Sequence, residues 1–385
     1  MKKWIVSCLA SCTVFAGYVN PAVMQDLVGR YIETDSDAMI ILQNGEPLLR
    51  LGSINDRVEA MSITKSMVSL AVGILIDQGK IPSIDTPVSF FFPEWKAPMK
   101  CDVTIRHLLN HTAGIESYRT LEEAYLIPDH LKSALNSNII DVPGTRFAYS
   151  QKGVNLLAGI VELVAGEPLD LFVERMIFNP LGIGTDYYWN RDFAGHTIGM
   201  YGMEISAEHL AKIGQLMLNE GMWNGERLVS AEWVRLSMSP SQSLNPSCGL
   251  LWWLDREHRI TWPSELLAEY RLHGVDEGIV SILETVGPEG LTLNDYNLIK
   301  LFGSRERYEQ FMDQIEENNL KRFNLQVGEV RGARAEGYLG QYILIIPSEQ
   351  LVAVRLIKFG KVAEGVCDYF KDFVDLVHKL TLEAN

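Results

Sequence analysis

The sequence EAMSITKSMVSLAVGILIDQGKI, residues 59–81, joins a long apolar run to two reactive side chains at its start. Nearly every residue from Met67 to Ile76 is apolar, which predicts a helix buried on all sides. Ser62 and Lys65 stand three residues apart just before this run. Because residues three apart share a helix face, we expect the Ser62 hydroxyl and the Lys65 amine to meet where a core helix begins.

This pairing has a catalytic and a structural interpretation. A serine hydroxyl is a weak nucleophile until a base removes its proton. A lysine amine is such a base when burial lowers its pKa. Alternatively, Ser62 caps the helix and Lys65 extends to solvent. Ser-x-x-Lys also arises by chance about once or twice in a chain of this length, so the spacing alone leaves both interpretations open.

The composition is that of a globular protein. The chain has 385 residues, of which 47% are hydrophobic and 22% charged, and this length suggests about two domains or one large composite domain. Its net charge of −15 repels phosphate backbones and argues against nucleic acid as a partner. The five cysteines show no metal-ligand spacing, and no His/Glu/Asp cluster stands out. We therefore expect neither a metal site nor a cofactor.

The first 20 residues resemble a secretory signal. Lys2 and Lys3 precede an apolar run from Trp4 to about Val19. Cleavage after Ala16 fits this pattern, and residues 9–12 (LASC) also resemble a lipoprotein processing site. The alternative is an ordinary N-terminal helix. We expect an exported protein, periplasmic, secreted or lipid-anchored, with membrane attachment only through this segment.

The predicted strands lie near both ends of the chain and the predicted helices between them. Asn44-Gly45 marks a hairpin within residues 38–52, and two further strands cover 341–347 and 351–358. The fold class is therefore α+β: an antiparallel sheet built from both chain ends, with flanking helices and an inserted mainly helical domain. The predicted parts are a sheet domain (21–82 and 326–385), a helical domain (83–255) and a helical insertion of unknown role (256–325).

Several further segments fit one known family. Residues 59–81 resemble the nucleophile helix of the serine β-lactamase and penicillin-binding-protein superfamily, whose signature is Ser-x-x-Lys. The segments that resemble later landmarks of its class C β-lactamase and esterase branch are 104–115 (TIRHLLNHTAGI), 147–166 (FAYSQKGVNLLAGIVELVAG), 205–234 and 336–347 (EGYLGQYILIIP). The resemblance covers about residues 38–255 and 330 to the end. It implies a β-lactamase/transpeptidase-like fold and a serine hydrolase that works through an acyl-enzyme.

The resemblance also implies roles in the second catalytic segment. Tyr149-Ser150-Gln151 stands where the family has Tyr-x-Asn, which makes Tyr149 the proton carrier. We expect a nearby ammonium group to lower the pKa of this phenol, so that its phenolate is a base; the alternative is a buried, hydrogen-bonded tyrosine. Gln151 keeps an amide on a longer side chain and is expected to contact Lys65 and substrate. His111 is interpreted as a structural turn residue.

The third family motif, Lys-Thr-Gly or His-x-Gly, is missing. Counting back from GYLGQY (337–342) places its position at residues 332–334. Arg334 there either restores the lost positive charge or is a solvated strand residue. The oxyanion hole requires two backbone N–H groups, which we expect from Ser62 and Ala335.

These assignments predict a serine hydrolase with Ser62, Lys65 and Tyr149 as its catalytic residues. The missing third motif favours an esterase or amidase acting on a small ester, amide or amino-acid-derived substrate. One alternative is a β-lactamase or D-amino-acid peptidase. Another is a non-catalytic binder or sensor that keeps the fold; the altered Gln151 and third motif favour it, and the intact catalytic residues oppose it.

Overall fold

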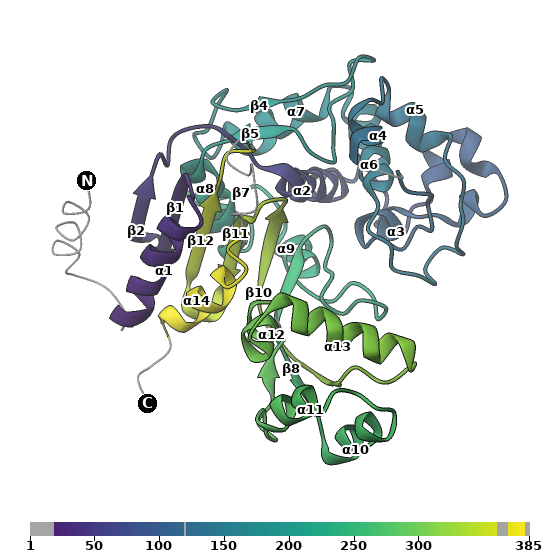
Figure 1. The fold of residues 1–385 in the computed structure, drawn as a ribbon. Coiled ribbons are helices and arrows are strands. Elements are labelled where there is room, and N and C mark those ends of the chain that lie inside the picture. Colours follow the sequence, from purple (N-terminus) through teal and green to yellow (C-terminus); the bar gives the residue numbers. More distant parts are fainter. Residues whose placement is uncertain (1–18, 119–120, 294, 360–368, 382–385) are drawn as a thin grey trace.

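The computed structural model of the chain describes residues 19–118, 121–293, 295–359 and 369–381 (Figure 1). The predicted signal, residues 1–20, therefore lies outside the described residues except for its last two positions. Within the described ranges, no helix has both the length and the apolar character that crossing a membrane requires.

A seven-stranded antiparallel sheet forms the centre of the molecule (Figure 1). Its strand order is β2-β1-β12-β11-β10-β8-β9. The strands are β1 (Ala38–Gln43), β2 (Glu46–Gly52), β8 (Trp253–Thr261), β9 (Leu291–Thr292), β10 (Asn324–Gly337), β11 (Gln341–Ile346) and β12 (Leu351–Leu356). Because β1 pairs with β12, the two ends of the chain form one continuous sheet, which confirms the predicted fold class.

Turn residues set the register of this sheet. Asn44 and Gly45 have φ angles of 53° and 80°, the left-handed pair that a tight hairpin needs, so β1 and β2 are joined as predicted. Between β11 and β12 the chain makes a short 3₁₀ turn at Pro347–Glu349. Every residue of β1, β11 and β12 is buried, so these strands are covered on both faces.

Helices from different parts of the chain cover the two faces of the sheet. Helices α1 (Pro21–Glu33) and α14 (Phe373–Leu380) share an apolar cluster with one face. Helix α8 (Ala207–Leu218) packs on the other, where a Cβ on Gly214 would lie 2.5 Å from Val352. The predicted boundary at residue 255 had placed α8 in the helical domain, whereas it belongs to the sheet layer.

Helix α2 (Thr64–Asp77) lies at the centre of the helical part. All its residues from Thr64 to Leu75 are buried, as the apolar run predicts. The other helices of this part are α3 (Ile105–Leu109), α4 (Leu121–Tyr125), α5 (His130–Leu135), α6 (Gln151–Ala165), α7 (Leu169–Val173) and α9 (Ala231–Ser237). Two small sheets, β3 (Val58–Glu59) with β5 (Met203–Ile205) and β4 (Tyr188–Trp189), and β6 (Met222–Trp223) with β7 (Glu226–Arg227), complete this part.

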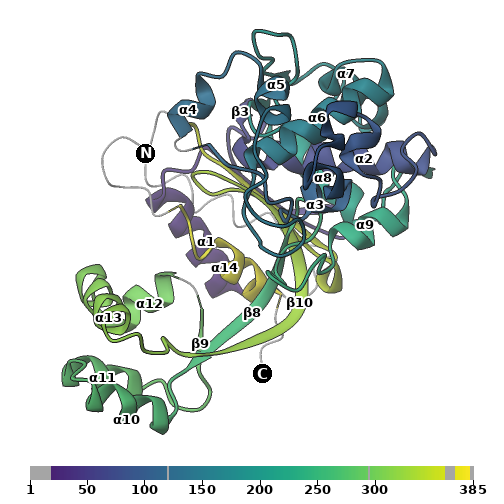
Figure 2. The same cartoon turned by 90° about the vertical axis from the view of Figure 1, so that its right-hand side faces the viewer.

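The insertion projects from the ends of β8 and β10 (Figure 2). Its helices α10 (Ser264–Leu272), α11 (Glu277–Glu284), α12 (Asp295–Phe302) and α13 (Arg305–Glu317) enclose an apolar cluster of their own. The predicted insertion, residues 256–325, begins inside β8 and ends inside β10. The sheet therefore extends into this region, and helices occupy its middle.

Candidate active site

Ser62 lies in a short 3₁₀ turn, Met61–Ile63, that leads directly into α2. Met61 has a φ angle of 52°, an uncommon left-handed conformation for a non-glycine residue. Strand β10 passes close by: a Cβ on Gly337 would lie 2.5 Å from the Ala60 carbonyl oxygen and 2.9 Å from the Met61 Cβ. The end of β10 is thereby pressed against the backbone that carries Ser62.

Lys65 reaches the Ser62 hydroxyl, as the three-residue spacing predicts. Its Nζ lies 2.8 Å from Ser62 Oγ and also donates a hydrogen bond to the Met200 carbonyl oxygen. The side chain is only 3% exposed. Burial disfavours the ammonium form and lowers the pKa of Lys65 to about 7. A large share of the amine is therefore neutral near pH 7 and able to accept a proton.

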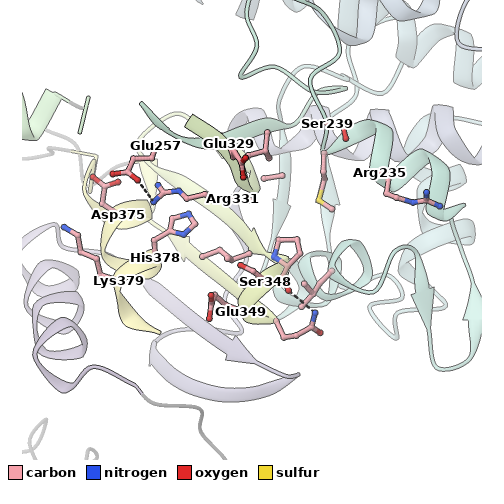
Figure 3. A pocket seen from close by; sticks show the side chains of 18 of the residues that line it. Arg235, Ser239, Glu257, Glu329, Arg331, Ser348, Glu349, Asp375, His378 and Lys379 are labelled. Carbon is pink, nitrogen blue, oxygen red and sulfur yellow. Dashed lines mark hydrogen bonds and ion pairs between the residues drawn. The ribbon is translucent and has the colours of Figure 1, made fainter. Parts of the chain in front are cut away.

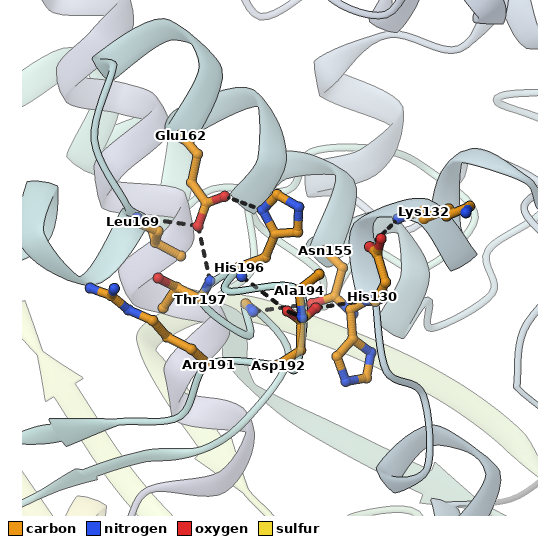
Figure 4. A network of polar contacts seen from close by, with 12 residues as sticks. His130, Lys132, Asn155, Glu162, Leu169, Arg191, Asp192, Ala194, His196 and Thr197 are labelled. Carbon is orange, nitrogen blue, oxygen red and sulfur yellow. Dashed lines mark hydrogen bonds and ion pairs between the residues drawn. The ribbon is translucent and has the colours of Figure 1, made fainter.

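The loop that carries Met200 is held against α6 (Figure 4). The Glu162 carboxylate accepts the Thr197 N–H at 2.9 Å and contacts His196 Nδ1 at 2.7 Å. Closer to Met200, the Asn155 side-chain oxygen accepts the Gly199 N–H at 3.1 Å. These bonds place the carbonyl that receives the Lys65 amine.

Tyr149 stands beside Ser62 at the start of α6. Its hydroxyl is hydrogen-bonded to Ser62, and Lys65 Nζ lies 5.2 Å from the centre of its ring. The surrounding protein desolvates the hydroxyl and raises the pKa of Tyr149 to about 12, although the ring is 37% exposed. The prediction of a lowered phenol pKa was wrong, because desolvation outweighs the hydrogen bond with Ser62, and the negative charge of Glu336 acts in the same direction as desolvation. Tyr149 is therefore a protonated phenol near pH 7.

Two cavities that share part of their walls adjoin Ser62 and Tyr149. The inner one holds about 10 Å³, roughly the space of one water, and includes Lys65 and His111 in its wall. The outer one holds about 510 Å³ and is open to solvent. Trp253 and Glu336, which our sequence reasoning did not select, line both cavities.

The third catalytic segment lies three residues later than we predicted. Gly332 and Ala333 line a separate cavity of about 1000 Å³, together with Arg331 and His378 (Figure 3). Of the predicted positions 332–334, only Arg334 lines the outer cavity at Ser62, and residues 336–338 line it as well. Gly337, whose missing side chain permits the close approach to Ala60, therefore takes the place of the motif glycine.

The peptide directions along β10 follow from its pairing with β8. Leu254 donates its N–H to the Ser247 carbonyl, so the backbone N–H and C=O of Leu254 point away from β10. The backbone N–H and C=O of the neighbouring residue, Trp253, then point toward β10, where Trp253 pairs with Arg334. Since these directions alternate along a strand, Arg334 and Glu336 direct their peptide groups toward the β8 side.

This alternation corrects the predicted oxyanion residue. Ala335 lies opposite Ile343 on β11 and directs its N–H toward that strand. It is 1% exposed and does not line the cavities at Ser62. The pairing of β8 with β10 ends at Arg334, so beyond Arg334 this edge of β10 has no partner from β8. Tyr338, two residues after Glu336, occupies this edge beside Ser62.

Arg334 lines the outer cavity beside Ser62, where its side chain is paired with carboxylates. Its Nε donates to Glu336 Oε2 at 2.9 Å, and its Nη1 lies 3.9 Å from Asp255 Oδ1. Its side chain is 24% exposed. Arg334 is thus a partly buried cation at the cavity with Glu336 as its hydrogen-bonded partner, and not a solvated strand residue.

Gln151 does not line either cavity at Ser62, contrary to our expectation. It is the first residue of α6, and its side-chain oxygen is buried without a hydrogen-bond partner among the described residues. Its predicted contact with Lys65 is also replaced, since Met200 supplies the second partner of that amine.

Comparison with known proteins agrees with this fold and identifies a serine hydrolase of the β-lactamase and penicillin-binding type. The family model named Beta-lactamase matches residues 24–258. The chain therefore belongs to the beta-lactamase family.

Named relatives resemble the chain in sequence, and a solved structure shares its fold. The 6-aminohexanoate-dimer hydrolase of Paenarthrobacter ureafaciens is 28% identical over 234 residues, 55% of this chain and 59% of the relative. Esterase EstB of Burkholderia gladioli is 31% identical over 144 residues, 32% of this chain and 36% of the relative. The structure of EstCE1, a hydrolase with promiscuous acyltransferase activity, shares the fold with a TM-score of 0.59 and 16% identity, covering 93% of this chain and 98% of that one.

The lowered pKa of Lys65 predicts a pH dependence for acylation. Because only the neutral amine accepts a proton, kcat/KM should rise with pH through about 7 and then level off. The measurement is a pH profile of kcat/KM for an uncharged ester. Lys65→Arg keeps the cation but cannot deprotonate, and should lose about a hundredfold or more at every pH. A profile that is flat from pH 5.5 to 9 would contradict this role of Lys65.

Proposed function

We propose that this protein hydrolyses a small ester or amide through an acyl-enzyme on Ser62. The observation that carries the proposal is the 2.8 Å approach of the buried Lys65 amine to Ser62 Oγ. The printed names of two relatives, an esterase and a 6-aminohexanoate-dimer hydrolase, support this substrate class. Both names describe attack on a carbonyl group.

The proposed acylation moves one proton through three side chains. Neutral Lys65 takes the Ser62 proton while Oγ attacks the substrate carbonyl carbon. The N–H groups of Ser62 and Tyr338 hold the developing oxyanion. As the carbonyl–leaving-group bond breaks, the Tyr149 phenol gives its proton to the leaving group, and the Lys65 ammonium restores it. Water then attacks the acyl group and gives one proton to the Lys65 amine. As the acyl–oxygen bond breaks, the Lys65 ammonium returns that proton to Ser62 Oγ.

The third segment supports substrates that lack a carboxylate beside the scissile bond. With Gly337 as the motif glycine, Ala335 stands where the family has a cation and Glu336 where it has a hydroxyl. Glu336 lines both cavities at Ser62, and its negative charge contributes to the raised pKa of Tyr149. At these two positions the carboxylate of a β-lactam or a peptide terminus would therefore meet Ala335 and Glu336 instead of a cation and a hydroxyl. The Arg334 guanidinium, which also lines the outer cavity, is already paired with Glu336.

Active-site labelling tests the hydrolase proposal. A fluorophosphonate should add to wild-type protein once, as seen in the intact mass, and peptide mass spectrometry after digestion should place the adduct on Ser62. The Ser62→Ala variant, which keeps the fold but lacks the nucleophile, should remain unlabelled. We also expect p-nitrophenyl esters to be turned over faster than β-lactams. Absence of labelling in folded wild-type protein would favour the non-catalytic binder.

Glu336 provides a test of the substrate preference. In Glu336→Gln the negative charge is lost and Arg334 loses its 2.9 Å partner, so a substrate carboxylate should be better tolerated. Removal of the partly screened repulsion between Glu336 and a substrate carboxylate predicts an increase in kcat/KM of about threefold to tenfold. This increase is measured for a carboxylate-bearing ester relative to its methyl ester. Glu329→Gln, in the separate cavity of Figure 3, is the matched control and should leave the ratio unchanged. An unchanged ratio in Glu336→Gln would contradict the assignment.

We also propose that the protein is exported through its N-terminal segment. The proposal rests on Lys2, Lys3 and the apolar run that follows them. N-terminal sequencing of the chain from a bacterial envelope or culture fraction should find a mature end near residue 17, or a lipidated Cys12. An intact Met1 confined to the cytosol would contradict the proposal.

A further inference from the structure

His111 lies directly behind the proposed proton carrier. It follows α3, is 3% exposed and forms part of the wall of the inner cavity at Ser62. Its φ angle of 59° turns the chain at this point, and its backbone oxygen accepts the Ala148 N–H at 2.9 Å. The imidazole is thereby brought against the segment that carries Tyr149.

The side chain of His111 contacts this segment in two ways. Nδ1 accepts the Ser150 N–H at 3.2 Å. The imidazole ring also lies 4.6 Å from the Tyr149 ring, measured between centroids. Ser150 in turn caps α6, since its Oγ accepts the Gly153 N–H at 3.0 Å. The residues before and after Tyr149 are therefore both hydrogen-bonded to His111.

The hydrogen bond from Ser150 also determines the state of the imidazole. An acceptor at Nδ1 requires the proton on Nε2. Burial and the nearby Lys65 amine lower the pKa of His111 to about 3, so the ring stays neutral and keeps this tautomer across the working range. His111 is thus excluded as a proton-transfer base but remains a steady acceptor.

We propose that His111 is a positioning residue whose Nδ1 acceptor, by holding the Ser150 N–H, fixes the Tyr149 hydroxyl for proton delivery to the leaving group. The inference rests on the proposed function. Proton delivery matters most when the leaving group is a poor one, such as an alkoxide, and little when it is p-nitrophenolate. Loss of the Nδ1 acceptor should therefore lower kcat/KM more for alkyl esters than for p-nitrophenyl esters.

Two amide substitutions separate positioning from general packing. In His111→Asn the side-chain oxygen takes the place of Nδ1, and asparagine tolerates a φ of 59°. In His111→Gln the oxygen falls closer to the place of Nε2. The matched control is His107, whose Nδ1 also accepts a backbone N–H, that of Thr104, at 3.2 Å, but which does not line the inner cavity.

The experiment measures kcat/KM for an alkyl ester and a p-nitrophenyl ester of the same acid, in wild type and in the Asn and Gln variants at 111 and 107. We expect His111→Gln to lose about a hundredfold on the alkyl ester and tenfold or less on the p-nitrophenyl ester, as displaced general acids do. His111→Asn should have a kcat/KM for the alkyl ester at least tenfold higher than that of His111→Gln. The His107 variants should leave the ratio of the two esters at its wild-type value.

The ratio of the two esters cancels the folded fraction of each preparation, so partial unfolding does not imitate the effect. Equal losses on both esters, or equal behaviour of the Asn and Gln variants at 111, would overturn the positioning role. If wild type labels at Ser62 and turns over both esters, such a result rejects only the role of His111. If wild type neither labels nor hydrolyses either ester, the proposed function fails and this inference fails with it.

Discussion

The burial of the Lys65 amine is the constraint on which the site depends. Lowering its pKa from 10.5 to about 7 means that the folded chain disfavours the ammonium form by on the order of 5 kcal/mol. Because the folded state binds fewer protons than the unfolded chain between these values, the contribution of this group to stability rises with pH from about 7 to 10.5. At neutral pH the fold therefore bears most of the cost of keeping a base next to Ser62.

The architecture supplies the surroundings that this buried amine needs. The start of α2 places Ser62 and Lys65 on one face, while Met200 arrives on a loop tied to α6 by Asn155 and Glu162. Ala60, two residues before Ser62, donates its N–H to the Met203 carbonyl at 2.8 Å, which fixes that loop to the nucleophile turn. Segments some 140 residues apart in the sequence thus enclose one amine, and the apolar interior around α2 makes the enclosure dry.

The sequence predicts those parts of the fold that local patterns determine. The apolar run of α2, the Asn44-Gly45 hairpin and the turn between β11 and β12 are all short-range features. The placement of the third segment was wrong because counting from 337–342 does not show which strand edge is open; that depends on where β8 stops pairing with β10. The pKa of Tyr149 was also wrong, since its direction depends on the balance between desolvation and a neighbouring charge, which only the packed structure shows.

The site separates the groups that perform chemistry from those that select the substrate. Ser62, Lys65 and Tyr149 come from the starts of α2 and α6, where helix packing and His111 restrain them. Recognition of a substrate carboxylate in the family depends on side chains of the third segment, and here that strand presents Ala335 and Glu336 instead. The proposed oxyanion donor of the third segment is the backbone N–H of Tyr338, which these side-chain changes leave in place as long as Gly337 allows the strand to approach Ala60. A chain with this division can lose the carboxylate-binding groups and keep the acyl-transfer chemistry, which is the combination that an esterase or amidase requires.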